Sequence, residues 1–548
     1  MTDQIESIRV YCEGGLDTTK NYLKLSSEKP GCATRLVNYE PAISGGYRRI
    51  NGFTYLDDTY PEPGDGICQG KVLGVMIFEN DVTRQLEIYA ARRLISPSDE
   101  YAIFQYNSLT GWDEIATGLT HYYQVGSDIV EKIRYDVGND SVQNYLAFAD
   151  GVNNAVIFDG ATWAFIDSAD TGASMANAGG NQAIDAPTLV AFFSHTLFLG
   201  CDVVNVTTGI AAYSAPDEFF NFTSASGGGQ LLAGLHIVDM KPFRDTLYLF
   251  GYNKIKKATP DVSAGFLTSD VTSNMGVVTR DCVVEIGGDL IFLGPDGFRP
   301  VQGTAKIGDV MLETISKPIH SLLRARTYDL ADINVNSVVI RNKAQFRFLF
   351  GDDDSDQSAS RGILGALRTA DQFEGWEFGE TLGFRASVIT SRMVGGDEYV
   401  LFGDYDGNVY RMEQGGSLNG QPMTAVYSTP YLDIGDTQTR KTMQSVTSFI
   451  VGEGADIDVN LGITYDWANP EITNPSSYVF TLESTPATYG VSNEYGDSSV
   501  YGGYMYPVIE QTIEGSFFSV RLTYTTSGIE SPYSVLGFVI QYKVEGLR

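Results

Sequence analysis

Carboxylates are the most numerous groups in this sequence that could do chemistry, but their spacing selects no active site. Residues 351–356 have the sequence GDDDSD and residues 404–407 the sequence DYDG, so both place carboxylates at alternate positions, as a calcium loop does. Neither is followed by the bidentate glutamate of an EF-hand. Because aspartate is common in turns, we favour solvated turns over calcium sites. Among 68 acidic residues, no pair stands out as the two carboxylates of a glycosidase.

The other reactive side chains give no stronger signal. The four histidines are His121, His195, His236 and His320, no two of them lie one helical turn apart, and no HExxH motif occurs. There is no GxSxG motif and no phosphate-binding GxxxxGK[ST] motif. The five cysteines form no CxxC pair, which fits synthesis in a reducing compartment. We therefore expect no catalytic residue, no cofactor and no metal, and predict that the chain is not an enzyme.

Two adjacent arginines are unusual in a chain with a formal net charge of −31. They lie in the segment GGYRRINGF at residues 45–53. If this segment is a strand, Arg48 and Arg49 point to opposite faces and cannot hold one phosphate together. In so acidic a chain they are more readily partners of carboxylates, which matters most where the pair is partly buried. We predict that Tyr47, Arg48 and Arg49 belong to an assembly interface.

The overall charge excludes a general nucleic-acid-binding protein. The chain has 37 basic and 68 acidic residues, so most of its surface would repel a phosphate backbone. No apolar run approaches the length of a membrane-spanning helix, and the first residues, MTDQIESIRV, lack a signal-peptide core. We expect synthesis in a cytoplasm and no membrane-spanning segment, and export by a non-classical route stays open.

A short apolar run followed by a Gly, Asp or Asn turn recurs along the chain, and this repeat predicts the fold. The runs start roughly 45–55 residues apart, the period of four-stranded propeller blades. They are YLAFADG (145–151), TLFLGCD (196–202), TLYLFGYN (246–253), LIFLGPDG (290–297), FRFLFGDDD (346–354) and YVLFGDYDG (399–407). The sequence therefore predicts an all-β chain with a divergent β-propeller of six or seven blades over residues 72–420. The alternative is a large β-sandwich.

Other segments depart from this repeat. Residues 308–330 place Met311, Ile315, Ile319 and Leu322 on one helical face, which predicts a helical insertion that begins at Asp309 and is kinked or split by Pro318. Residues 1–71 are expected to be an N-terminal extended segment with the first strands. Residues 421–548 alternate apolar and polar side chains and predict a C-terminal β-sandwich.

A Tyr-rich and Gly-rich loop interrupts the predicted sandwich at residues 488–507. It is too long for a hairpin, and loops of this length usually have a function or move. Tyrosine offers a rigid, amphipathic contact surface, so the loop is either a recognition tip or a packing loop between subunits. The candidate residues are Tyr489, Tyr495, Tyr501, Tyr504 and Tyr506.

Several segments resemble one family of viral proteins. The block GGLDTTKNYLKLSSEKPGCATRLVNYEPAISGGYRRINGF (14–53) is similar to the N-terminal segment of tail tubular protein B, the nozzle, and of the packaged-DNA stabilisation proteins of short-tailed bacteriophages. The segment VAFFSHTLFLG…IAAYSAPDEFFNF (190–222) resembles a blade of that family, in which an apolar strand leads to an ending of the type Ser…Asp-Tyr/Phe-Phe-Asn-Phe. Residues 274–301, the ISKPIHSLL segment and the ending GFVIQYKVEGLR resemble further parts.

The resemblance implies a function in the virion. It implies a propeller with accessory β domains, assembled as a hexameric ring below the portal and its adaptor, with tail fibre or tip proteins as further partners. Double-stranded DNA would pass through the ring without specific binding. An acidic wall suits this passage, because each phosphate neutralised by Lys or Arg would add affinity and friction. The protein would be assembled in the bacterial cytoplasm and reside in the phage tail.

Packaged DNA must also be retained, so we expect one loop to narrow the channel. The candidates are the loop 351–360, the loop 177–186 and the Tyr-rich loop. The gate residues proposed from the sequence are Asp352, Asp353, Asp354, Asp356, Asn181 and Gln182. Two other classes of protein stay open. One is a propeller that binds or cleaves glycans, in the tail or secreted, and the other is a secreted, monomeric propeller scaffold.

Overall fold

The computed structural model describes residues 5–42, 45–57, 70–94, 100–115, 122–124, 132–203, 207–263, 265–301, 314–327, 334–351, 360–370, 373–453, 457–482, 505–510, 513, 515–529 and 531–547. Strands dominate these ranges, so the predicted all-β class is confirmed. Two α-helices occur within them, α1 (Tyr22–Glu28) and α3 (His320–Thr327). No described helix is long and apolar enough to cross a membrane.

Seven antiparallel sheets follow one another along the described part of residues 72–412. The first contains β6 (Val72–Asn80), β7 (Gln85–Arg93), β8 (Glu100–Asn107), β9 (Gly111–Glu114) and β10 (Tyr122–Gln124), and the second β11 (Arg134–Asn139), β12 (Asn144–Ala149), β13 (Val156–Phe158) and β14 (Trp163–Phe165). The third contains β15 (Pro187–Phe193), β16 (Thr196–Asp202), β17 (Thr207–Tyr213) and β18 (Gly229–Leu232), and the fourth β19 (Asp239–Phe243), β20 (Thr246–Phe250), β21 (Ile255–Asp261) and β22 (Gly265–Thr272). The fifth contains β23 (Val283–Ile286), β24 (Asp289–Gly294) and β25 (Gly297–Pro300). The sixth contains β26 (Asn334–Ile340), β27 (Gln345–Gly351), β28 (Arg361–Ala370) and β29 (Phe373–Leu382). The seventh contains β30 (Val388–Val394), β31 (Asp397–Gly403) and β32 (Val409–Met412).

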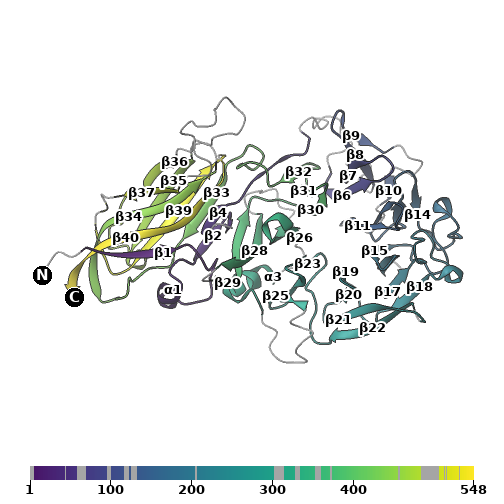
Figure 1. The fold of residues 1–548 in the computed structure, drawn as a ribbon, viewed down its shortest axis with the longest axis horizontal. Coiled ribbons are helices and arrows are strands. Elements are labelled where there is room, and N and C mark those ends of the chain that lie inside the picture. The colour runs from purple at the N-terminus through teal and green to yellow at the C-terminus, as the bar shows by residue number, and fades with distance from the viewer. Residues whose placement is uncertain are drawn as a thin grey trace, which may run out of the picture.

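The seven sheets stand around one centre (Figure 1). The first strand of each sheet contacts the first strand of the next, and β30 contacts β6, so the ring is closed. Each of the six apolar runs found in the sequence forms the second strand of a sheet. A second strand is covered on both faces by neighbouring sheets, which is why every residue of β16 and of β27 is buried.

The last sheet of the ring is completed by a strand from the N-terminal segment. Strand β5 (Phe53–Tyr55) pairs with β32, the final strand of the ring along the chain. Phe53 is buried there, with its ring 4.9 Å from that of Phe402 and 5.0 Å from that of Tyr410. The ring of sheets therefore includes residues that precede the predicted boundary at 71/72. The predicted domain boundaries, between residues 71 and 72 and between residues 420 and 421, stay predictions.

The C-terminal residues form two packed sheets beside the ring (Figure 1). One sheet continues the order β26-β27-β28-β29 through β2 (Arg35–Val37) into β33 (Met423–Ser428), β39 (Val520–Gly528), β35 (Ile457–Tyr465) and β36 (Tyr478–Leu482). The other contains β3 (Tyr39–Pro41), β4 (Tyr47–Arg49), β40 (Tyr533–Leu547), β34 (Thr439–Gly452) and β37 (Met505–Glu510), with β1 (Ile5–Tyr11) and β38 (Ser516–Phe517) alongside.

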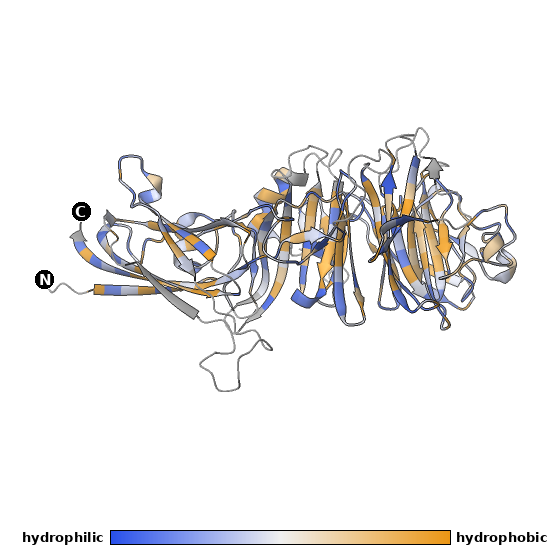
Figure 2. Ribbon diagram, turned by 90° about the horizontal axis from the view of Figure 1, so that it is seen from above, coloured by the Kyte–Doolittle hydropathy of each residue, from blue (hydrophilic) through white to orange (hydrophobic). Residues whose placement is uncertain are grey.

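The two C-terminal sheets pack against each other through the buried side chains of strands in which buried and more exposed residues alternate. Buried and partly exposed residues alternate along β35 and β39, as expected of strands with one face in a core. Hydrophobic residues recur along the strands of both parts of the molecule (Figure 2). Tyr427, Tyr465 and Tyr524 are fully buried in the core between the two sheets.

Of the helical insertion predicted at 308–330, the structure describes residues 314–327, and residues 317–327 of these are helical. A 3-10 turn at Lys317–Ile319 leads directly into α3, and Pro318 lies in its first turn. Proline is tolerated there because the first N–H groups of a helix have no partner in the helix. Ile319 is buried and Leu322 packs against the core, whereas Asp309 and Met311 lie outside the described residues.

Candidate functional site

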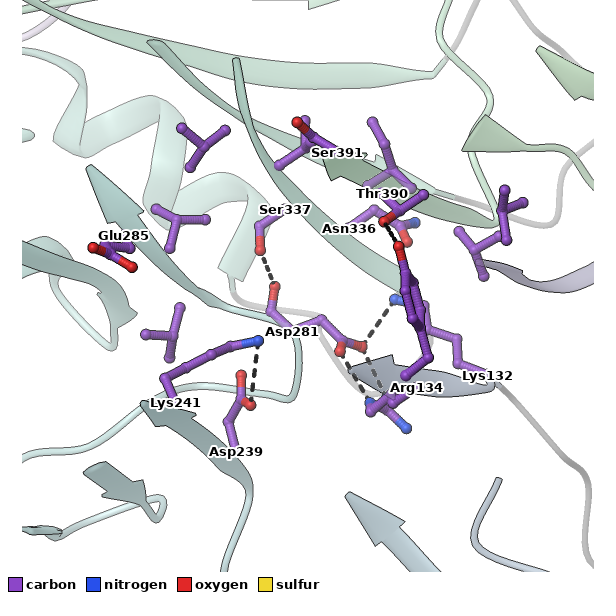
Figure 3. Close-up of a pocket in the computed structure, with 18 of the residues that line it drawn as sticks. Lys132, Arg134, Asp239, Lys241, Asp281, Glu285, Asn336, Ser337, Thr390 and Ser391 are labelled. Atoms are coloured by element: carbon purple, nitrogen blue, oxygen red, sulfur yellow. Dashed lines mark hydrogen bonds and ion pairs between the residues drawn. The ribbon is translucent and has the colours of Figure 1, made fainter. Parts of the chain in front are cut away.

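The first strands of all seven sheets line a central cavity of about 300 Å³. Its charged side chains are Arg341, just after β26, and six from the second, fourth and fifth sheets: Lys132 and Arg134 from the start of β11, Asp239 and Lys241 from β19, and Asp281 and Glu285 from the start of β23 (Figure 3). Ser337, Thr390 and Ser391 add hydroxyl groups. A closed ring therefore brings together charges that lie far apart in the sequence.

Asp281 is the most strongly held carboxylate of the cavity. Arg134 donates to its two oxygens at 3.0 and 2.8 Å, and Lys132 donates at 3.0 Å (Figure 3). Burial alone would raise the pKa of Asp281, but the positive charges of Arg134 and Lys132 outweigh it and hold this pKa well below its usual range. Asp281 is therefore ionised at every physiological pH.

Asp239 has the opposite environment. Its side chain is buried, Lys241 lies 3.8 Å from its Oδ1, and its Oδ2 has no hydrogen-bond partner among the described residues. Burial raises the pKa of Asp239, Lys241 offsets part of the rise, and the charge of Asp281 adds to it. The cavity thus holds two carboxylates whose pKa values are displaced in opposite directions.

Two carboxyl groups whose pKa values are displaced in opposite directions are one feature of acid–base sites. A carboxyl group with a raised pKa can donate a proton, while a neighbouring carboxylate with a lowered pKa stays ionised. Tyr135 is the one aromatic side chain among the described lining residues, and its hydroxyl group is bonded to that of Thr390 at 2.6 Å. The cavity therefore suits a small polar ligand better than a flat apolar one. No group of three or more His, Cys, Asp and Glu side chains suited to a metal ion occurs within the described ranges.

Sequence reasoning missed this site. Its signal was charged residues at alternate positions of otherwise apolar strand segments, KIR at 132–134 and DMK at 239–241. Alternation sends both charges of each segment to one face. The sequence could not show that these faces meet, because they belong to different sheets.

Arg48 and Arg49, which were predicted to lie at an assembly interface, form hydrogen bonds with residues of the same chain. Arg48 donates to Glu40 at 2.7 Å and binds both oxygens of Glu453, at 2.7 and 2.6 Å. Arg49 is fully buried, and its Nη2 donates to the backbone carbonyls of Gly416, Met423 and Gly528. Each arginine therefore has intramolecular partners. A contact of this segment with another subunit stays a prediction.

Glu40 extends this network toward the ring of sheets. It is buried and accepts hydrogen bonds from Arg48, Lys343 and Arg347. Burial would raise the pKa of Glu40, but the charges of Lys343, Arg347 and Arg48 together lower it. Tyr47, the third interface candidate, is also fully buried, and its hydroxyl group accepts a hydrogen bond from Gly15 N at 2.9 Å.

The gate and tip candidates are dispersed. Asn181 is bonded to Ser224, and the carbonyl of Gln182 accepts a hydrogen bond from Gln230 on β18, the outermost strand of the third sheet. Tyr506 lies in β37, opposite Ile450. The remaining candidates lie outside the described residues, namely Asp352, Asp353, Asp354, Asp356, Tyr489, Tyr495, Tyr501 and Tyr504.

The acidic segment 404–407 is an Asp-stabilised turn. Asp404 is buried, and its Oδ1 accepts hydrogen bonds from the backbone N–H groups of Asp406 and Asn408 at 2.9 and 2.8 Å. Its Oδ2 accepts from the Asn408 amide and the Tyr410 hydroxyl group. Both oxygens are thus occupied within the chain.

Comparison with known proteins yields similarity in structure alone. No family model and no curated protein matches the sequence. An ancestral GH74 enzyme matches with a TM-score of 0.39 and 10% identity over 69% of this chain and 50% of that one, so this chain spans about half its length. BBS1N, solved in complex with ARL6DN, matches with a TM-score of 0.37 and 9% identity over 66% of this chain and 97% of that one.

These matches correct one expectation. The sequence predicted that the chain is not an enzyme, and a similar solved structure is a glycoside hydrolase family enzyme. That prediction is therefore withdrawn. Its basis was the lack of a local motif, and the carboxylates of the central cavity form no local motif because they come from separate sheets.

Proposed function

We propose that this protein forms the nozzle ring in the tail of a short-tailed bacteriophage, below the portal and its adaptor. In this proposal the seven sheets are the blades of a β-propeller, and the C-terminal sheets are an accessory β-sandwich. Packaged double-stranded DNA is retained by the nozzle ring of six chains and passes along the axis of that nozzle ring during ejection. Tail fibre or tip proteins attach to the same ring.

The observation that supports this proposal is the position in the fold of residues 14–53, the segment that resembles the nozzle family. Residues 14–53 contain β2, which joins β29 of the ring to β33 of the C-terminal sheets, and they lead into β5, which completes the last sheet of the ring. Arg49, Tyr47 and Glu40 of this segment are buried. The resemblance therefore lies in residues that determine how the two parts are joined.

The charge of the chain agrees with passage of DNA. A formal net charge of −31 disfavours binding of a phosphate backbone, and a duplex that must move quickly should not be bound. We propose that the acidic surface lines the channel along the axis of the six-chain nozzle ring. Deleting the loop 177–186, the loop 351–360 or the Tyr-rich loop should release DNA from filled particles if that loop is the gate.

Electron microscopy of the purified protein, alone and mixed with a portal–adaptor complex, tests this function. The proposal expects a six-fold ring that docks on the adaptor. A chain that stays monomeric by light scattering and leaves the adaptor unoccupied would exclude it. A loop-deletion series that retains DNA in all three mutants would exclude the gate, but not the ring.

A second function is favoured by the carboxylates of the central cavity. Asp239, with its raised pKa, and Asp281, with its lowered pKa, have the properties of the acid and the base of a glycan-cleaving site. Hydrolysis of an oligosaccharide panel by the wild-type protein tests this function. Activity that is lost in both Asp239→Asn and Asp281→Asn, with folding retained, would support it, and no activity toward any member of the panel would exclude it.

A further inference from the structure

Exposed aromatic side chains gather on the C-terminal part of the molecule, away from the central cavity. Trp467 and Tyr22 are each 45% exposed, and Leu23 next to Tyr22 is 52% exposed. Between them lies Tyr431, whose ring is buried and forms the floor. Its centroid is 6.2 Å from that of Tyr22 and 6.3 Å from that of Trp467.

The backbone holds Trp467 outward at a cost. Asp466, Trp467 and Ala468 have φ values of 44°, 55° and 57°, the left-handed region that non-glycine residues avoid. The turn is locked, because Asp466 Oδ1 accepts hydrogen bonds from the backbone N–H groups of Phe518 and Ser519 at 2.7 and 2.9 Å. Strain that is over-determined by its surroundings is typical of functional sites.

A cation lies on the floor of this patch. The guanidinium of Arg521, from β39, is 3.9 Å from the centroid of Tyr431 and 5.6 Å from that of Tyr22. Its Nε is buried and has no hydrogen-bond partner among the described residues. No carboxylate of the described part of the chain forms an ion pair with it, although the chain has 68 acidic residues and 37 basic ones.

We propose that Tyr22, Tyr431, Trp467 and Arg521 form a binding site for an acidic sugar residue of a glycan. A sugar ring presents a face of C–H groups that stacks on an exposed indole, and a carboxylate on that ring pairs with a planar guanidinium. Arg521 supplies the charge complementarity that selects a carboxylated sugar over a neutral one. The site rests on neither function proposed above, since it lies between α1 and the edge of the C-terminal sheets and needs no ring of subunits.

Isothermal titration with two acidic oligosaccharides, oligogalacturonate and oligosialic acid, tests the proposal. The matched control ligands are their neutral, carboxyl-reduced counterparts. We expect saturable binding of at least one acidic ligand and at least tenfold weaker binding of its reduced counterpart. Failure of both acidic ligands to bind, or equal binding of the reduced forms, would overturn the proposal.

Variants locate the site on the protein. Trp467→Ala and Arg521→Met should each weaken binding at least tenfold, and Arg521→Lys should restore part of it. Tyr11→Ala removes a similarly exposed ring, 55% exposed on β1, and should leave binding unchanged. Circular dichroism and thermal unfolding check that each variant is folded. Binding that survives both Trp467→Ala and Arg521→Met, or self-association that is lost in Trp467→Ala without any sugar binding, would contradict this site.

Discussion

Arg49 donates a hydrogen bond from its Nη2 to the backbone carbonyl of Gly528 at 2.6 Å, across 479 residues of sequence. The same nitrogen reaches the carbonyls of Gly416 and Met423. One buried guanidinium therefore ties the N-terminal segment both to the end of the ring of sheets and to strands β33 and β39. The arginine that is most distinctive in the sequence determines internal architecture.

Replacing this guanidinium should destabilise the fold. Arg49→Met keeps the apolar stem but leaves two buried carbonyl oxygens and a partly buried one without this donor, and we expect a loss of about 3 kcal/mol in the free energy of unfolding. Chemical denaturation measures this loss. Arg35→Met, at an exposed position of β2, is the control and should change it by less than about 0.5 kcal/mol. Equal stability of the two variants would show that Arg49 is not a structural link.

Strand β5 gives a second test. Phe53→Ala removes a ring that packs against Phe384, Phe402 and Tyr410, and such truncations cost about 3–5 kcal/mol. Thr54→Ala, on the exposed face of the same strand, is the matched control and should be nearly neutral. Thermal unfolding of the two variants distinguishes them. If Phe53→Ala melts like Thr54→Ala, the N-terminal strand does not close the ring.

Substitution of the two carboxylates of the cavity should change the free energy of unfolding by different amounts. The folded-state pKa of Asp281 is depressed, so its contribution to stability is present above the unfolded pKa of about 4 and is lost as the pH falls below that value. Asp281→Asn leaves Arg134 and Lys132 without their carboxylate and should cost about 3–5 kcal/mol at pH 7.

Asp239 has a raised folded-state pKa, so its ionisation destabilises the folded state as the pH rises above about 4 and through that folded pKa. Asp239→Asn removes this cost but also the carboxylate that raises the pKa of Lys241, so it should lower the free energy of unfolding at pH 7 much less than Asp281→Asn does. Denaturation curves between pH 3 and pH 8, taken for the wild-type protein and both variants, measure the difference. Equal losses for the two substitutions at pH 7 would refute the assigned environments.

The described cysteines should be unreactive in the folded protein. Burial raises the pKa of Cys12 and of Cys32 to about 12, and Cys201 and Cys282 are also buried. Since the thiolate is the nucleophile, labelling by a disulfide reagent at pH 8 should be slow. A Cys68→Ser variant confines the measurement to these four thiols. It should react rapidly only after unfolding in urea, and rapid labelling of the native variant would contradict the burial.

The sequence predicted the repeated unit of the fold better than its closure. Apolar runs such as TLFLGCD identified the second strand of six of the seven sheets, because a strand covered on both faces has to be apolar. The closing strand FTY at 53–55 could not be found in this way. It is very short, and its partner β32 is the last strand of the ring, so no local pattern links the two.

The candidate site was harder to predict for a related reason. Lys132, Asp239 and Asp281 become neighbours only when the ring closes, and no local spacing encodes that distance. The helix predicted at 308–330 is found where that segment is described, at Lys317–Ile319 and in α3, because its apolar residues recur at helical spacing. Helix α1 was missed, although Asn21 caps it by accepting a hydrogen bond from Leu23 N at 3.1 Å.

The most direct test of the proposed nozzle function is electron microscopy of the purified protein mixed with a portal–adaptor complex. Each chain should contribute a closed ring of seven sheets, and six chains should surround one axis and dock below the adaptor. Arg35→Met should assemble in the same way. A monomeric protein that leaves the adaptor unoccupied at every concentration examined would contradict the account.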